Sequence, residues 1–140
     1  MQWHQKAGTA PVAVSSGVTQ RSTLILAAVA GATAVGAGAF AAHALDGRVE
    51  PELLPVFEVG ARYHAYHALA LLGLAAVIER LGRGGDVAAW CFVVGTLIFS
   101  GTLYALTLTG QRWLGAVTPI GGVLLIAGWV AVGVAAWRRR

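Results

Sequence analysis

Charged side chains are scarce in this sequence, and their scarcity excludes most classes of protein. Lys and Arg number 10 and Asp and Glu number 6, together 11% of the 140 residues, against roughly 25% in soluble domains. Hydrophobic residues make up 57%, before the 19 glycines are added. These proportions exclude a soluble enzyme domain and a disordered tail. They indicate an integral membrane protein with one bundle of a few helices.

Side chains that are charged at neutral pH are absent from the hydrophobic runs themselves. The runs Ser22–Ala42, Val87–Gln111 and Trp113–Trp137 contain no Asp, Glu, Lys or Arg. A charged group inside a membrane is costly and usually marks a functional pathway. The absence of an embedded carboxylate therefore disfavours a proton-driven multidrug exporter.

The sequence also lacks the groups that disulfide, metal and catalytic chemistry require. Cys91 is the single cysteine, which excludes an internal disulfide and a multi-cysteine metal site. Neither a G-x-S-x-G nucleophile motif nor an H-E-x-x-H metal motif occurs. We therefore expect no catalytic residue, no metal and no cofactor. The net charge of +4 comes from scattered basic residues, so we expect no nucleic-acid partner.

Four hydrophobic segments predict four membrane-spanning helices. About 20 residues at ~1.5 Å each cross a hydrocarbon core of ~30 Å. The second segment is charge-free only from Tyr63 to Ile78, and the amphipathic stretch Pro51–Arg62 extends it. The predicted fold is an all-α bundle with spans at about 23–43, 55–79, 87–109 and 114–137. These lie in a transmembrane domain, 22–140, after an N-terminal extension, 1–21, that we expect to be poorly ordered.

The distribution of basic residues predicts the orientation of the spans. The N-terminal tail, the second loop and the C-terminal tail carry seven basic residues, whereas the first and third loops carry three. The positive-inside rule then predicts that both termini are cytoplasmic, in the inner (cytoplasmic) membrane of a bacterium. An alternative is that the first segment is a signal peptide cleaved near Ala39-Phe40-Ala41, which would leave three spans.

Small residues recur on the predicted helices and let helices approach closely in lipid. We expect such packing within the chain at Gly31, Gly38, Gly101, Gly121 and Gly122. The alternative is that these glycines contact another subunit, in a homo-oligomer or a larger membrane complex.

Polar side chains gather at the predicted outer ends of the helices. The candidate residues of this outer cluster are His43, Glu58, Arg62, Tyr66, His67, Arg112 and Thr118. A hydrogen-bonded network that ties helix ends together is the favoured interpretation. A site for a small solute, a lipid headgroup or a partner protein is the second. A metal or haem site, in which His64 and His67 would join His43, is the least favoured because no clustered carboxylates support it.

Four stretches of the sequence resemble a known family. They are GAFAAHAL (Gly38–Leu45), FEVGARYHAYHALALL (Phe57–Leu72), FSGTLYALTLTG (Phe99–Gly110) and RWLGAVTPIGG (Arg112–Gly122). Together they resemble the bacterial YgdD-like family of small four-span membrane proteins, a domain of unknown function with mitochondrial relatives in animals. The resemblance implies topology and location but no activity. In the family pattern a glutamine stands where this chain has His64, which argues against the metal site.

The sequence thus predicts a non-enzymatic, multi-pass membrane protein that serves as a structural, assembly or accessory subunit. The alternative is a binder or transporter of a small ligand that uses the outer cluster. The expected partners are the lipid bilayer and further copies of the chain or a larger membrane complex.

Overall fold

The computed structural model describes residues 17–139, and in this part of the chain every regular element is helical. The four long helices are α1 (Gln20–Phe40), α2 (Leu54–Ala75), α4 (Arg83–Thr109) and α5 (Leu114–Trp137). A short π-helix, η1 (Ala41–Leu45), continues α1, and one turn, α3 (Ile78–Leu81), connects α2 to α4. Most of the predicted N-terminal extension lies outside the described residues, which include its last five positions, 17–21.

Local sequence explains where the helices begin and end. Thr19 and Ser22 form a capping box in which each hydroxyl accepts a hydrogen bond from the other residue's backbone N–H, and α1 starts there. Pro55 lies in the first turn of α2, where the missing N–H of proline is tolerated. Gly110 ends α4 with a φ of 69°, a left-handed conformation that favours glycine.

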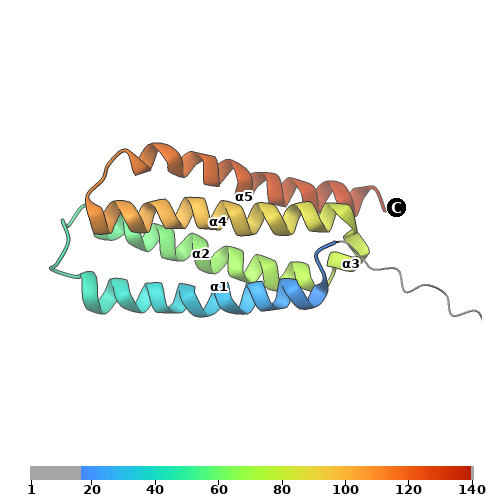
Figure 1. Cartoon of the computed structure of the whole chain (residues 1–140), viewed down its shortest axis with the longest axis horizontal. Helices are drawn as coiled ribbons and strands as arrows, with labels where there is room; N and C mark the ends of the chain where they lie inside the picture. Colours follow the sequence, from blue (N-terminus) through green and yellow to red (C-terminus); the bar gives the residue numbers. More distant parts are fainter. Residues whose placement is uncertain (1–16, 140) are drawn as a thin grey trace, which may run out of the picture.

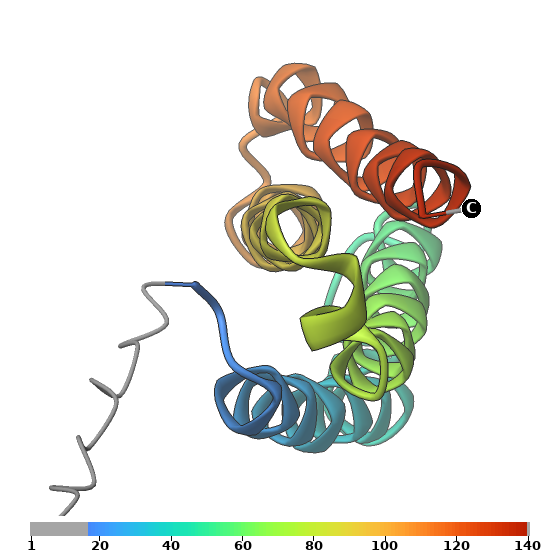
Figure 2. The same cartoon turned by 90° about the vertical axis from the view of Figure 1, so that its right-hand side faces the viewer.

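The long helices lie side by side in an open, staggered row: they follow one another in Figure 1, and Figure 2 shows that α2 and α4 are offset to opposite sides of it. α1 packs on α2, α2 on α4, and α4 on α5, so that α1 and α5 form the two edges. Both ends of the described chain lie at the same end of the row, beside α3. We refer to this as the α3 end, and to the opposite end, where α2 and α5 begin, as the loop end.

Three helical segments are long and apolar enough to cross a membrane: Gln20–Leu45, α4 and α5. α2 has 22 residues but does not belong to this group. Its first fourteen residues are too polar, because they include Glu58, Arg62, His64 and His67. Of the four predicted spans, three are therefore confirmed by length and composition, and α2 is not.

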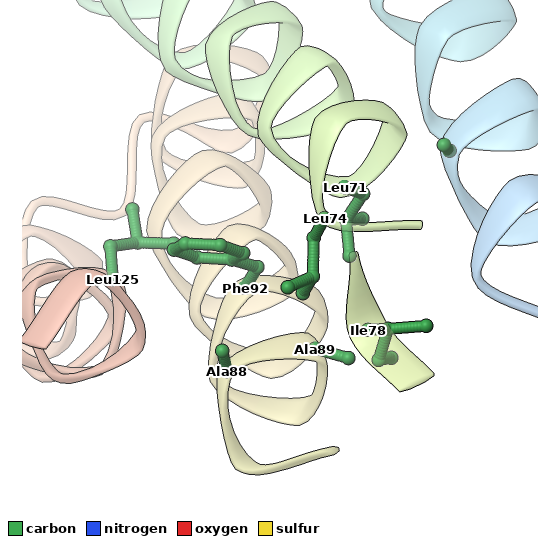
Figure 3. Close-up of a cluster of buried hydrophobic side chains, with 8 residues drawn as sticks. Leu71, Leu74, Ile78, Ala88, Ala89, Phe92 and Leu125 are labelled. Atoms are coloured by element: carbon green, nitrogen blue, oxygen red, sulfur yellow. The ribbon is translucent and has the colours of Figure 1, made fainter. Parts of the chain in front are cut away.

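The main core lies towards the α3 end of the row. Phe92 of α4 projects between Leu71 and Leu74 of α2 and Leu125 of α5, as Figure 3 shows. Ile78 of α3 closes the same cluster. Towards the loop end, a smaller cluster joins Ala41 and Leu45 of η1 to Phe57 of α2, and the Phe57 and Tyr104 ring centroids lie 4.4 Å apart. These two clusters fix the rotation of α2 about its axis.

Candidate functional site

The structure does not bring the predicted outer cluster together. His43 is exposed on η1, and Glu58, Arg62 and Tyr66 are exposed on α2. Glu58 and Arg62 lie one helical turn apart, a spacing that suits an ion pair, but the structure shows no ion pair between them. Between residues 17 and 139 the only ion pair joins Arg112 Nη2 to Glu50 Oε2, at 3.5 Å and with both side chains largely exposed. Such an exposed pair contributes about 0–1 kcal/mol to stability.

The two buried members of the cluster belong to different helix contacts. His67, which is 5% exposed, lies between α2 and α4, and its Nδ1 is 2.8 Å from the Tyr63 carbonyl oxygen. Its ring centroid lies 5.5 Å from that of Phe92. The Thr118 hydroxyl lies between α5 and α4, 2.8 Å from the hydroxyl of Thr102. Each residue therefore helps to hold one pair of helices.

The polar contact that joins three helices centres on His64, which is not one of the seven candidate residues and which the sequence suggests only as a metal ligand. Its Nε2 lies 3.3 Å from Thr33 Oγ1 of α1, and its Nδ1 lies 3.3 Å from the Tyr104 hydroxyl of α4. One ring nitrogen of a neutral imidazole donates and the other accepts, so the ring can satisfy both neighbours at once. We call Thr33, His64 and Tyr104 the His64 junction.

A glycine one turn away makes room for the junction. A Cβ atom on Gly60 would lie 2.9 Å from Tyr104 Cε1, closer than carbon atoms pack. The absent side chain lets the tyrosine ring lie across α2, against Phe57. A signal for His64 was present in the sequence, because Phe57, His64 and Leu71 are spaced by seven residues and so share one helix face. Two of these three residues are buried in the core clusters.

Loss of the His64 junction should cost a measurable part of the stability. We expect His64→Leu to lower the free energy of unfolding by about 0.5–1.5 kcal/mol for each lost hydrogen bond. His64→Gln should cost less, because glutamine also carries a donor and an acceptor. Thermal unfolding in a mild detergent measures both effects.

The matched control for the junction is Tyr66→Phe, which removes an exposed hydroxyl from the same helix. Tyr104→Phe should destabilise the natural protein but have little further effect in His64→Leu. Additive losses in that double variant would contradict the junction, because independent sites add and contacting ones do not.

An apolar groove lies beside the junction, between the edge helix α1 and α4, with α2 as its floor. It has a volume of about 320 Å³ and is lined by Val29 and Thr33 of α1, His64 and Ala68 of α2, and Thr96 and Leu97 of α4, among others. Its lining is apolar except at these few polar side chains. Small-molecule sites in proteins have this composition and begin at about this size.

Two hydroxyl groups on the α2-facing side of α4 lack hydrogen-bond partners among the described residues. Thr96 and Ser100 are 8% and 2% exposed, and their hydroxyl oxygens are fully buried. Other threonines in these helices, such as Thr102 and Thr107, donate to the carbonyl four residues earlier. An unpartnered buried hydroxyl costs about 1–3 kcal/mol. Thr96 is therefore an unusual polar group in the wall of the apolar groove.

The described residues contain no group of three or more His, Cys, Asp or Glu side chains that could hold a metal ion. His43, His64 and His67 make separate contacts or none, and Cys91 is a half-buried free thiol. The arrangement provides helix-to-helix hydrogen bonds and an apolar groove.

The predicted packing glycines differ in their surroundings. A Cβ atom on Gly121 would lie 2.8 Å from Phe99 Cα, so this glycine is a point of close approach between α5 and α4. Next to it, Gly122 has room for a methyl group. Gly31, Gly38 and Gly101 have no atom of another helix within 4 Å of the Cβ position. Close approaches also occur at Gly60, Gly84, Gly85, Gly95 and Gly128.

Comparison with known proteins identifies the family. The family model "Protein of unknown function (DUF423)" matches residues 37–122. The chain is 44% identical over 115 residues to the UPF0382 membrane protein YwdK of Bacillus subtilis, covering 81% of this chain and 94% of that one. It is 38% identical over 127 residues to the UPF0382 inner membrane protein YgdD of Escherichia coli, covering 86% and 93%. No solved structure matches. The resemblance seen in the sequence is thereby confirmed, and the chain belongs to the DUF423, or UPF0382, family of membrane proteins of unknown function.

Proposed function

We propose that this protein is a non-enzymatic, four-span protein of the bacterial cytoplasmic membrane. The fourth span in this proposal is α2, which lies between α1 and α4 along the row (Figure 2). Its charged residues, Glu58 and Arg62, are exposed and lie within its first three turns, close to the loop end. Long charged side chains near a helix end can extend to the headgroup region while the helix itself crosses the bilayer.

We propose that the α3 end of the row faces the cytoplasm. Arg80, Arg83, Arg138 and Arg139 lie there, whereas four of the six acidic residues belong to the first loop and the start of α2. An excess of arginine and lysine in short loops and tails is typical of the cytoplasmic side. Both termini would then be cytoplasmic.

Within this topology, the proposed role is that of an accessory or assembly subunit that binds another membrane protein or a second copy of itself. The observation that carries the proposal is the open row of helices. In the most apolar stretch of α1, and in that of α5, 17% of the residues are buried, against 39% in α4. Gly31 and Gly38 lie one turn after the buried residues Ala27 and Ala34 of α1, at the edge of its buried face, and their Cβ positions are free, so another helix can approach closely there.

Substitution of Gly38 tests this role. We expect Gly38→Leu to fold, because the Cβ position has free space within the chain, but to lose its partner. In mild detergent the natural chain should elute in a complex, and the variant should show a reduction of about tenfold or more in that species. The control is Gly133→Leu on α5, which also has free space. Equal assembly of the natural chain and Gly38→Leu would refute the proposed contact.

A second candidate role is the binding of an apolar small molecule in the groove between α1, α2 and α4. Thr96 favours this role, because its buried hydroxyl lines the groove and has no partner among the described residues. The ligand class is a lipid-soluble molecule with one hydrogen-bonding group. Extraction of the purified protein with an organic solvent distinguishes the two roles. One extracted apolar molecule per chain supports ligand binding. A stable protein complex from which no such molecule is extracted supports the accessory role.

A further inference from the structure

A second groove lies at the α3 end, between α4 and α5. Its floor is formed where Gly84 of α4 contacts Ala135 of α5, since a Cβ atom on this glycine would overlap the alanine side chain. The groove has a volume of about 370 Å³. Val87 and Val134 line its walls, and both are exposed apolar side chains. This second groove is therefore apolar along the helices.

Three arginines surround the outer end of this groove. Arg83 is the first residue of α4, and Arg138 and Arg139 follow the end of α5. Arg139 folds back over the turn between α3 and α4, so that its Nη2 lies 2.9 Å from where a Cβ of Gly82 would be. Gly82 has a φ of 55°, which favours glycine at this turn.

These arginines have no carboxylate partner among residues 17–139. The only ion pair in that part of the chain lies at the opposite end of the row. Asp86 in the first turn of α4 accepts a hydrogen bond from the Val18 backbone N–H at 3.0 Å and has no ion-pair partner among residues 17–139. The groove therefore combines three unneutralised guanidinium groups with an apolar channel.

The combination selects an amphiphilic anion. A guanidinium group presents its donors as a planar fork that matches a phosphate. A free phosphate would bind the arginines but leave the apolar walls uncovered. A neutral acyl chain would cover the apolar walls but leave the arginines without an anion. Ala131, which also lines the groove, lies seven residues before Arg138, so the channel extends about 10 Å from the charged end along the helix.

We propose that this second groove is a binding site for one anionic phospholipid. The headgroup phosphate lies between Arg83, Arg138 and Arg139, and one acyl chain runs between α4 and α5 along Val87 and Val134. The site lies at the α3 end, the proposed cytoplasmic side, where basic pockets between transmembrane helices meet anionic headgroups. The lipid site depends neither on the accessory role nor on the apolar groove between α1, α2 and α4, so it can be tested separately from both.

Native mass spectrometry of the full chain in mild detergent tests the site. Phosphatidylglycerol, phosphatidylcholine with the same acyl chains, and inorganic phosphate are added in turn. We expect one tightly bound phosphatidylglycerol per chain and little binding of the other two. Arg138→Gln/Arg139→Gln should weaken phosphatidylglycerol binding roughly 30-fold, because each basic residue near a headgroup contributes about a factor of five.

Two further variants separate this site from general charge effects. Arg48→Gln/Arg62→Gln removes the same charge from exposed positions elsewhere and should leave lipid binding unchanged. Val87→Trp keeps the arginines but fills the acyl channel, so it should also reduce phosphatidylglycerol binding. Equal binding of the two lipids, or equal losses in the two double-arginine variants, would overturn the proposal. Tight binding of inorganic phosphate that is insensitive to Val87→Trp would also overturn it, in favour of a simple phosphate site.

Discussion

Gly121→Ala should destabilise the contact between α4 and α5, whereas Gly122→Ala, one residue later, should be tolerated. The new methyl group at Gly121 would lie 2.8 Å from Phe99 Cα and even closer to its backbone nitrogen. A backbone cannot move aside as a flexible side chain can, so the two helices must separate. At Gly122 the nearest atom is Phe99 Cδ2, at 3.7 Å, which is an ordinary contact.

The adjacent position makes this comparison internally controlled. Both substitutions gain about 1 kcal/mol of helix propensity, because alanine replaces glycine in a helix. Overpacking at Gly121 should cost about 1–3 kcal/mol or more. We therefore expect the melting temperature of Gly121→Ala in mild detergent to lie roughly 5 °C or more below that of Gly122→Ala. Equal melting temperatures would contradict the observed rotation of α5 against α4.

The helices themselves were largely predictable from the sequence, because their limits depend on local chemistry. The uncharged run from Val87 to Gln111 is long enough for a span, and α4 ends inside it, at Thr109, where Gly110 follows as the cap. The sequence predicts that the stretch Pro51–Arg62 extends the second segment and that the span itself begins at about residue 55. The helix α2 begins at Leu54, next to Pro55. Both prolines suit a first turn, so propensity alone does not distinguish them.

The site was less predictable, because spacing along one helix does not reveal which neighbour a face meets. Glu58 and Arg62 have the spacing for an ion pair, yet both are exposed and neither pairs. His64 lies on the opposite side, towards α1 and α4, because Phe57 and Leu71 anchor that face of α2 in the two cores. The partners of His64 are 31 and 40 residues away in the sequence. Such contacts depend on the order of helices in the row.

The same limitation applies to the glycines. Successive residues on an α-helix point about 100° apart, so two neighbouring glycines can have different surroundings. Gly121 contacts Phe99 while Gly38 has free space around it, although both belong to glycine-rich stretches. Composition indicates that helices can approach closely, and only the packing shows where they do.

Phe92→Ala should cause a large loss of stability, because Phe92 is the central side chain of the main core. The ring is 1% exposed and joins α2 to α5, with its centroid 5.1 Å from that of Trp129. Figure 3 shows it projecting between the leucines of both helices. Truncation of a buried phenylalanine costs about 3–5 kcal/mol through lost contacts and the cavity that remains. Trp90→Ala is the control in thermal unfolding, because Trp90 is a larger side chain on the same helix but is 61% exposed.

A second substitution makes the contact between Phe92 and α5 testable in its own right. A Cβ atom on Gly128 would lie 2.6 Å from Phe92 Cε1, so Gly128→Ala alone should destabilise the protein by about 1–3 kcal/mol. In Phe92→Ala the clashing ring is gone, and the alanine at position 128 should then cost little or even fill part of the cavity. The double variant should therefore be more stable than the sum of the two single losses implies, by about 0.5–3 kcal/mol. Strict additivity in thermal unfolding would mean that α5 does not pack on Phe92 through Gly128. The packing of α5 on α4 would then differ from the one described.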